Sequence, residues 1–233
     1  MAINKYWNDF LSIIYPQTCI GCGRDNLGDK QVLCWPCTSE LPLTHFEKQR
    51  GNLVEELFVG RIPLEMASAS FFFGKSSIVQ HLIHRVKYKG NQELGIHLGN
   101  MMGKAMLDAG WNDTIDIIIP LPLNKKKEAL RGFNQAALLA KGISQTLGKP
   151  MADVAVARIK HTETQTRKSR EERWENVAEV FGLVDGHGLE NKHVLLVDDV
   201  VTTGATLEAC GQVLIKIPGL KLSIATLAFA SKI

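Results

Sequence analysis

The chain has 233 residues, 45% of them hydrophobic and 22% charged, which is an ordinary composition for a globular protein with a buried core. This length predicts one main domain with a small appendage. The formal net charge of +3 at pH 7 is too small to indicate a nucleic-acid-binding protein by itself, and no apolar run reaches the roughly 18 residues that a membrane span requires.

The first predicted element is a helix over residues 3–15, where apolar residues recur at the spacing of one helix face. Pro16 ends it, because the residue before a proline is pushed out of the α region. The segment lacks a basic start and a small-residue cleavage site, so no signal peptide is predicted and we expect a cytoplasmic protein. Its pattern favours a helix packed on protein, with docking to a partner or a membrane surface as the alternative.

A cysteine-rich, turn-rich segment follows to about residue 43. The pattern then predicts strands and helices in alternation: strands over 67–73, 115–119, 154–159, 193–197 and 222–229, and helices over 78–88, 134–147 and 205–217. Such alternation is typical of an α/β fold with a parallel sheet flanked by helices. We expect two units, residues 1–45 with the first helix and the cysteines, and residues 60–233 with the α/β domain.

Four of the five cysteines form two closely spaced pairs, Cys19-x2-Cys22 and Cys34-x2-Cys37, separated by eleven residues. Paired CxxC motifs at this separation predict a structural, tetrahedral Zn²⁺ site that leaves no coordination position open for catalysis. Disulfides fit poorly because no secretion signal is present, and neither pair lies beside a thioredoxin-like βαβ unit. Cys210 falls on a predicted helix, where it is expected to be a small buried apolar residue.

The most informative segment is 194–206, in which an apolar strand ends in Asp198 and Asp199 and a small, hydroxyl-rich loop opens a helix. Open α/β sheets bind ligands at this end of their strands. Backbone N–H groups of such a loop at a helix start form an anion cradle, and two carboxylates can accept hydrogen bonds from a vicinal diol. The segment therefore predicts a site for a phosphorylated ribose. The alternative is an Asp-capped helix start, for which one Asp suffices.

Segment 198–206 resembles the loop that binds phosphoribosyl pyrophosphate (PRPP) in type I phosphoribosyltransferases, and the whole chain from the cysteines onward resembles the ComF family (ComFC, GntX). Three further blocks carry the resemblance. The first is Lys87-Tyr88-Lys89-Gly90, and the second is Pro120-Leu121-Pro122-Leu123 together with Arg131-Gly132-Phe133-Asn134-Gln135. The third is the set Arg158, Thr162, Gln165, Arg173, Asn176 and Phe181. The chain departs from the family at Asn124, where histidine is usual, and at Ala129, where a further arginine is common.

The resemblance implies a role for each part of the site. Asp198 and Asp199 would hold the ribose hydroxyls, and the 5′-phosphate would lie on the loop formed by Val200, Val201, Thr202, Thr203, Gly204, Ala205 and Thr206. The pyrophosphate, with Mg²⁺, would contact Arg131 and the lysines Lys125, Lys126 and Lys127. The segment between the second and third core strands would cover the site and supply Gln165 and Arg173. A solvated basic loop is the alternative interpretation of the three lysines.

The family resemblance also implies a function connected with natural competence, which is DNA uptake or the use of DNA as a nutrient. The first hypothesis is a phosphoribosyltransferase that displaces pyrophosphate from PRPP, with Asp198, Asp199 and Arg131 as its catalytic residues and an unnamed acceptor. The second is a non-catalytic protein that senses PRPP and binds single-stranded DNA or another competence protein. A DNA-binding role predicts affinity that falls steeply with salt.

Overall fold

The computed structural model describes residues 18–25, 27–28, 31–158 and 181–230. Its strands are β1 (Met66–Phe72), β2 (Ile117–Pro120), β3 (Val156–Arg158), β4 (Phe181–Leu183), β5 (His193–Val201) and β6 (Lys221–Phe229). Its α-helices are α2 (Trp35–Ser39), α3 (Leu53–Glu56), α4 (Ile78–Lys89), α5 (Gln92–Asp108), α6 (Lys125–Arg131), α7 (Gln135–Leu147) and α9 (Ala205–Leu214). Short 3-10 helices lie at η1 (Phe46–Lys48) and η2 (Trp111–Asp113).

A four-stranded parallel sheet in the order β1-β6-β5-β2 forms the centre of the protein. A parallel bridge between Ile118 and Met151 extends the β2 edge. The side chains of β5 alternate between two hydrophobic clusters, with Leu195 and Val197 in the first and Val194 and Leu196 in the second. Because both faces of the strand are buried, its sequence is continuously apolar, which is the pattern that predicts a parallel sheet.

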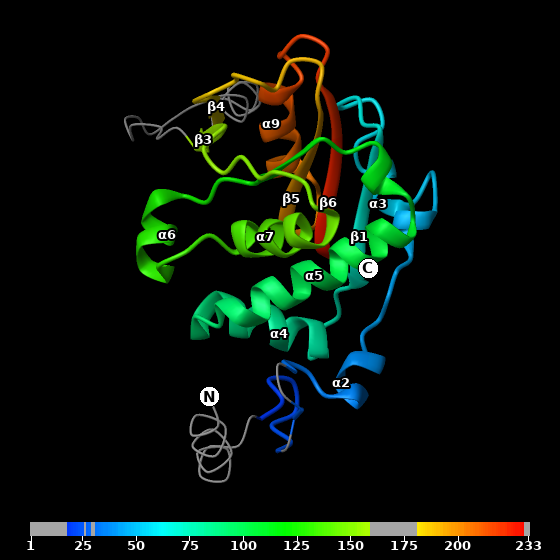
Figure 1. Cartoon of the computed structure of the whole chain (residues 1–233), viewed down its shortest axis with the longest axis vertical. Coiled ribbons are helices and arrows are strands. Elements are labelled where there is room, and N and C mark those ends of the chain that lie inside the picture. Colours follow the sequence, from blue (N-terminus) through cyan, green and yellow to red (C-terminus); the bar gives the residue numbers. More distant parts are fainter. Residues whose placement is uncertain (1–17, 26, 29–30, 159–180, 231–233) are drawn as a thin grey trace, which may run out of the picture.

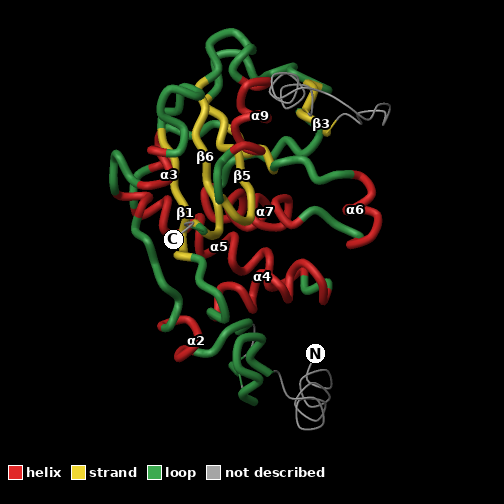
Figure 2. The backbone as a smooth tube through the Cα atoms, turned by 180° about the vertical axis from the view of Figure 1, so that it is seen from behind, coloured by secondary structure: helices red, strands yellow, loops and turns green. Residues whose placement is uncertain are grey.

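The layers of the fold are seen in Figure 1, where α5 and α7 lie against one face of the sheet, α4 lies outside them, and the cysteine segment lies beyond α4. Apolar residues of all these elements join the first hydrophobic cluster, which runs from the sheet to the cysteines. The view from behind shows α9 and α3 on the other face, where they belong to the second cluster (Figure 2). In the described part, no helix combines the length and the apolar character needed to cross a membrane.

The parallel α/β sheet with flanking helices is confirmed, and the structure corrects four details of the predicted elements. A 17-residue helix, α5, occupies a segment for which no helix is predicted. The three lysines expected in a loop begin helix α6. The strand expected over 154–159 is the short β3, which pairs antiparallel with β4 in a separate two-stranded sheet. The helix expected over 205–217 ends at Leu214. The helix expected over 3–15 lies outside the described residues.

Glycines explain why α5 escapes prediction. Gly95, Gly99 and Gly103 form a stripe along the helix, and each lowers intrinsic helix propensity by about 1 kcal/mol relative to alanine. The stripe faces α7, and a Cβ atom on Gly99 would lie 2.2 Å from the backbone oxygen of Leu139. The helix is therefore stabilised by close backbone packing against α7, which is a tertiary effect.

Gly99→Ala is expected to destabilise the protein by about 3 kcal/mol, although alanine is the better helix former, because two helix backbones must move apart to admit the methyl group. Denaturant unfolding measures the change. Gly74→Ala is a matched control, since its methyl group would meet only the Ser77 side chain at 3.6 Å. Equal stability of the Gly99 variant and the wild type would contradict the close α5–α7 packing.

Candidate functional site

The candidate site lies at the carboxyl ends of β2 and β5, which are neighbours in the sheet. The chain leaves β2 toward α7, most of whose buried apolar residues belong to the first hydrophobic cluster. It leaves β5 toward α9, whose buried apolar residues belong to the second. The two connections therefore run to opposite faces of the sheet. A parallel sheet opens a crevice for ligands where its connections diverge in this way.

The loop after β5 leads directly into the start of α9, as the sequence predicts. Gly204 precedes α9 with a φ of 73°, a conformation that favours glycine, and no side chain caps the helix. The first N–H groups of a helix have no partner within it, so those of α9 are available to an anionic ligand. Thr202, Thr203 and Thr206 are exposed around this helix start.

Two residues without a predicted role support the loop after β5 from the face of the sheet that carries the second hydrophobic cluster. The guanidinium of Arg61 donates a hydrogen bond to the carbonyl oxygen of Thr203 at 2.7 Å and forms an ion pair with Glu208 of α9. The Phe58 ring packs against Gly204, where a Cβ atom would lie 2.8 Å from the ring. No local sequence signal identifies this support, because the partners lie more than 140 residues apart.

The two adjacent carboxylates differ in their surroundings. Asp199 continues the row of Leu195 and Val197 and forms an ion pair with Lys87 of α4, with 2.5 Å between Oδ2 and Nζ. Asp198 falls on the opposite side of the strand and accepts a hydrogen bond from the Asp199 N–H at 2.8 Å. Burial, and after it the charge of Asp199, raises the pKa of Asp198 to about 8, although the Asp199 N–H and Lys87 act in the other direction.

The basic part of the site is built on α6 and the start of α7. Arg131 donates a hydrogen bond to Gln135 Oε1 at 2.6 Å, and its guanidinium lies over the Tyr88 ring at 5.5 Å from the centroid. Gln135 lines a narrow pocket together with Lys87 and Asp199. Gln135 therefore connects Arg131 to the pocket that Asp199 lines.

The three lysines are placed differently from Arg131. Lys125 lines an open cavity of about 340 Å³ at the carboxyl end of β2, together with Pro122 and Asn134. Lys126 and Lys127 are exposed on α6, and no contact in the described ranges links them to Asp199. Gln165 and Arg173 lie outside the described residues.

Asn124, where the chain departs from the ComF pattern, has a structural role. Its side chain caps α6 by accepting a hydrogen bond from the Lys126 N–H at 3.0 Å. At the other end of this helix Gly132 adopts a φ of 79°, which brings the chain round to α7. Asn134 caps α7 and donates to the Leu121 carbonyl oxygen at 3.0 Å, so the helix is tied to the end of β2.

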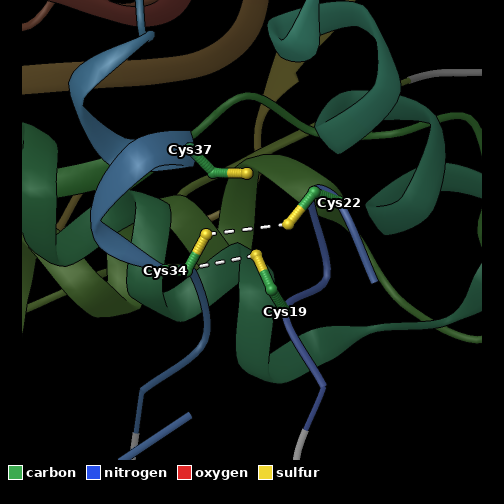
Figure 3. A group of neighbouring side chains, drawn as sticks. All are labelled: Cys19, Cys22, Cys34 and Cys37. Atoms are coloured by element: carbon green, nitrogen blue, oxygen red, sulfur yellow. Dashed lines mark hydrogen bonds between the residues drawn. The ribbon is translucent and has the colours of Figure 1, made fainter. Parts of the chain in front are cut away.

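The second candidate site is the group of cysteines Cys19, Cys22, Cys34 and Cys37, whose sulfur atoms all lie within 4.8 Å of one another. Figure 3 shows the four side chains converging on one point. The Sγ atoms of Cys22 and Cys34 are 3.7 Å apart, and tetrahedral Zn²⁺ with Zn–S bonds of about 2.3 Å requires about 3.8 Å. The group fits a tetrahedral metal ion.

The backbone of this segment favours thiolate ligands. Burial raises the pKa of Cys19, but hydrogen bonds from the backbone N–H groups of Cys34, Cys22 and Gly21 and from the Cys34 thiol lower it to about 6. Burial and the three neighbouring sulfur atoms raise the pKa of Cys37, so the four thiols do not all ionise without a cation. A Cβ atom on Gly21 would lie 2.9 Å from the Cys37 sulfur, so glycine is needed there.

A phosphoribosyl transferase domain model matches residues 134–232, the part that contains the anion cradle. The chain is 31% identical over 212 residues to the DNA utilization protein YhgH of Salmonella typhi, an alignment that covers 79% of this chain and 91% of that protein. The chain belongs to the ComF family. It is also 35% identical to competence protein F of Haemophilus influenzae over 140 residues, which cover 58% of this chain and only 61% of that protein.

More distant relatives agree with the family. Competence protein ComFC of Bacillus subtilis is 27% identical over 141 residues, which are 60% of this chain and 55% of the relative. Among solved structures, adenine phosphoribosyltransferase of Saccharomyces cerevisiae is similar with a TM-score of 0.38 and 16% identity, over 60% of this chain and 69% of that one. The relatives confirm the predicted family, and the parallel sheet with flanking helices confirms the predicted fold class of this ComF protein.

Proposed function

We propose that this ComF protein binds the magnesium complex of PRPP at the carboxyl ends of β2 and β5. The observation that carries the proposal is the Asp198–Asp199 pair followed by a Thr-Thr-Gly-Ala-Thr segment at the start of α9, whose three threonines are exposed. The loop lies where the sheet connections diverge and within the segment that matches the phosphoribosyl transferase model. A phosphate on the α9 N-terminus and ribose hydroxyls on the carboxylates suit the chemistry of each group.

In the proposed reaction, the bond between C1 of the ribose and the diphosphate oxygen breaks, and an acceptor nucleophile forms the new bond to C1. The diphosphate leaves with the bonding electron pair and with its magnesium, which neutralises much of the developing charge. Arg131 and Lys125 lie on the β2 side of the site, where their positive charges stabilise the negative charge that develops on the diphosphate. Residues 202–206 and the Asp pair hold the rest of PRPP in place. Val200, Val201, Lys126, Lys127, Gln165 and Arg173 complete the proposed set.

Calorimetric titration of magnesium-PRPP into the purified protein tests the proposal. We expect saturable binding by the wild type and a loss of at least about 100-fold in affinity in the Asp198→Asn/Asp199→Asn variant, because two acceptors of ribose hydrogen bonds are weakened. Asp108→Asn/Asp113→Asn replaces the same number of carboxyl groups at exposed positions and is expected to bind normally. Absence of binding by the folded wild type would overturn the PRPP assignment.

We propose that the four cysteines hold a structural Zn²⁺. All five cysteines are free, and the four-sulfur geometry fits zinc, which has no open position in such a set. Reduced thiols also agree with a cytoplasmic location. Zinc content measured on the purified protein tests the assignment, with one ion per chain expected.

The names of the relatives support a role in competence or DNA utilisation, for which binding of single-stranded DNA is the second candidate function. The specific observation is Trp35, which directly follows the metal-ligating Cys34 and is 81% exposed. An exposed aromatic ring can stack on a base. Single-stranded DNA binding that weakens steeply with salt, fails in Trp35→Ala and survives Asp199→Asn would favour this function.

A further inference from the structure

Helix α4 delivers a lysine to the site from a direction that local sequence patterns do not indicate. Its buried residues Val79, Leu82, Ile83 and Val86 form a stripe at helical spacing. Lys87 lies four residues after Ile83 and therefore continues this inward face, where its side chain is only 23% exposed. An apolar stripe that ends in a half-buried cation needs a charged partner.

The partner is Asp199, whose side chain is 17% exposed and lies 2.5 Å from the Lys87 ammonium. Few other charges face this pair. Asp198 is adjacent on β5, Cys210 of α9 is close to Asp198 on the other face, and Gln135 of α7 is neutral. Burial and the charge of Asp198 raise the pKa of Cys210 to about 12, so its thiol is neutral. Lys87 is thus the cation that balances the two carboxylates in the described structure.

The next residue of α4 supports the basic side of the same site. The Tyr88 ring lies under the Arg131 guanidinium, and its other contact is the ring of His84, with centroids 4.7 Å apart. Consecutive residues at the end of one helix therefore contact Asp199 on the ribose side and Arg131 on the diphosphate side. Gly90, with a φ of 66°, ends the helix directly afterwards.

We propose that Lys87 is a positioning residue of the PRPP site, which fixes the Asp199 carboxylate in the orientation that receives the ribose hydroxyls. This inference rests on the proposed function and deepens it. The lysine acts through the carboxylate, because the ion pair restricts the side-chain torsions of Asp199. A ligand then meets an acceptor that is already oriented, so less ordering is needed on binding.

Lys87→Met is the decisive variant, because methionine keeps an unbranched stem for packing and removes the charge. Lys89→Met is its matched control, since Lys89 lies on the same helix but is exposed. Lys87→Arg restores the charge. Thermal unfolding of each variant confirms that it is folded before binding is measured.

Two readouts are measured on each protein. The first is the titration of the Asp198 carboxyl by carbon-13 NMR: the positive charge of Lys87 lowers the pKa of Asp198, so its titration midpoint is expected to rise in Lys87→Met and to stay unchanged in Lys89→Met. The second is calorimetry with magnesium-PRPP, for which we expect about a tenfold loss of affinity in Lys87→Met, recovery of most of it in Lys87→Arg, and none lost in Lys89→Met.

The outcomes separate this inference from the proposed function. An unchanged Asp198 titration in Lys87→Met, or unchanged PRPP affinity in that variant while the wild type binds, overturns the role of Lys87 alone. Failure of Lys87→Arg to recover affinity likewise overturns it, since a restored charge is then not sufficient. If Lys87→Met shows the shift in the Asp198 titration but the wild type binds no PRPP, the proposed function is overturned, and this inference with it.

Discussion

Removal of the proposed metal from the four-cysteine group is expected to lower the free energy of unfolding by several kcal/mol, because the binding free energy of a structural metal is part of the folding free energy. The effect is expected to spread to α4. Cys19, Cys34 and Cys37 belong to the same hydrophobic cluster as the inward face of α4, and the ring of His81 donates to the Ile20 carbonyl oxygen at 3.3 Å.

Cys34→Ser tests this expectation, since Cys34 is buried and its backbone N–H also donates to the Cys19 sulfur at 3.2 Å. We expect loss of the metal, a lower midpoint of denaturant unfolding and faster amide hydrogen exchange along α4. Cys210→Ala is the matched control, because it removes a buried cysteine that lies outside the group and should leave the metal content unchanged. Full metal content and wild-type stability in Cys34→Ser would contradict the assignment.

Because α4 also contacts the site, metal removal is expected to weaken PRPP binding without any contact between the metal and the ligand. The helix runs from the cysteine segment, which it contacts through His81, to Asp199, which it contacts through Lys87. Chelation followed by PRPP titration measures this coupling. Unchanged affinity in the metal-free protein would show that the site is formed independently of the cysteines.

Asp198→Asn is expected to stabilise the protein in a pH-dependent manner while it weakens PRPP binding. The pKa of Asp198 is about 8 in the folded state and about 3.9 in the unfolded chain. Between these pH values the unfolded state releases a proton that the folded state keeps, so the wild type loses stability as pH rises toward 8. Asparagine has no such proton, and the unfolding free energy of the variant is expected to exceed that of the wild type by several kcal/mol near pH 8 and by much less near pH 4.

Urea unfolding of both proteins at a series of pH values from 4 to 9 checks this prediction. The difference in unfolding free energy should grow with pH up to about 8 and then level off, since Asp198 is ionised in both states above that value. Asp108→Asn, at an exposed position on α5, controls for the loss of one negative charge. A difference that does not change with pH would mean that Asp198 is not held in an environment that disfavours its charge. Stabilisation at the expense of binding is typical of a functional residue.

Residue types and their spacing predict the parts of the protein that are contiguous along the chain. Most of the strand, the Asp pair, the loop and the start of the helix after it lie within thirteen residues, 194–206, and the cysteine pairs lie within nineteen, 19–37. In such segments the residue types, their spacing and the turn chemistry specify the local geometry, and the alternation of strands with helices specified the parallel sheet.

The contacts between distant residues at the site follow from tertiary packing. Lys87 reaches Asp199 across 112 positions of the chain, and Arg61 reaches Thr203 across 142. The Lys87-Tyr88-Lys89-Gly90 block was visible in the sequence, but its chemistry was not, because a helix end acquires its partners when the helix packs. Likewise α5 forms against its local propensity, since Gly99 lets its backbone pack closely on α7. Contacts of this kind depend on the packing of whole elements, which no local pattern records.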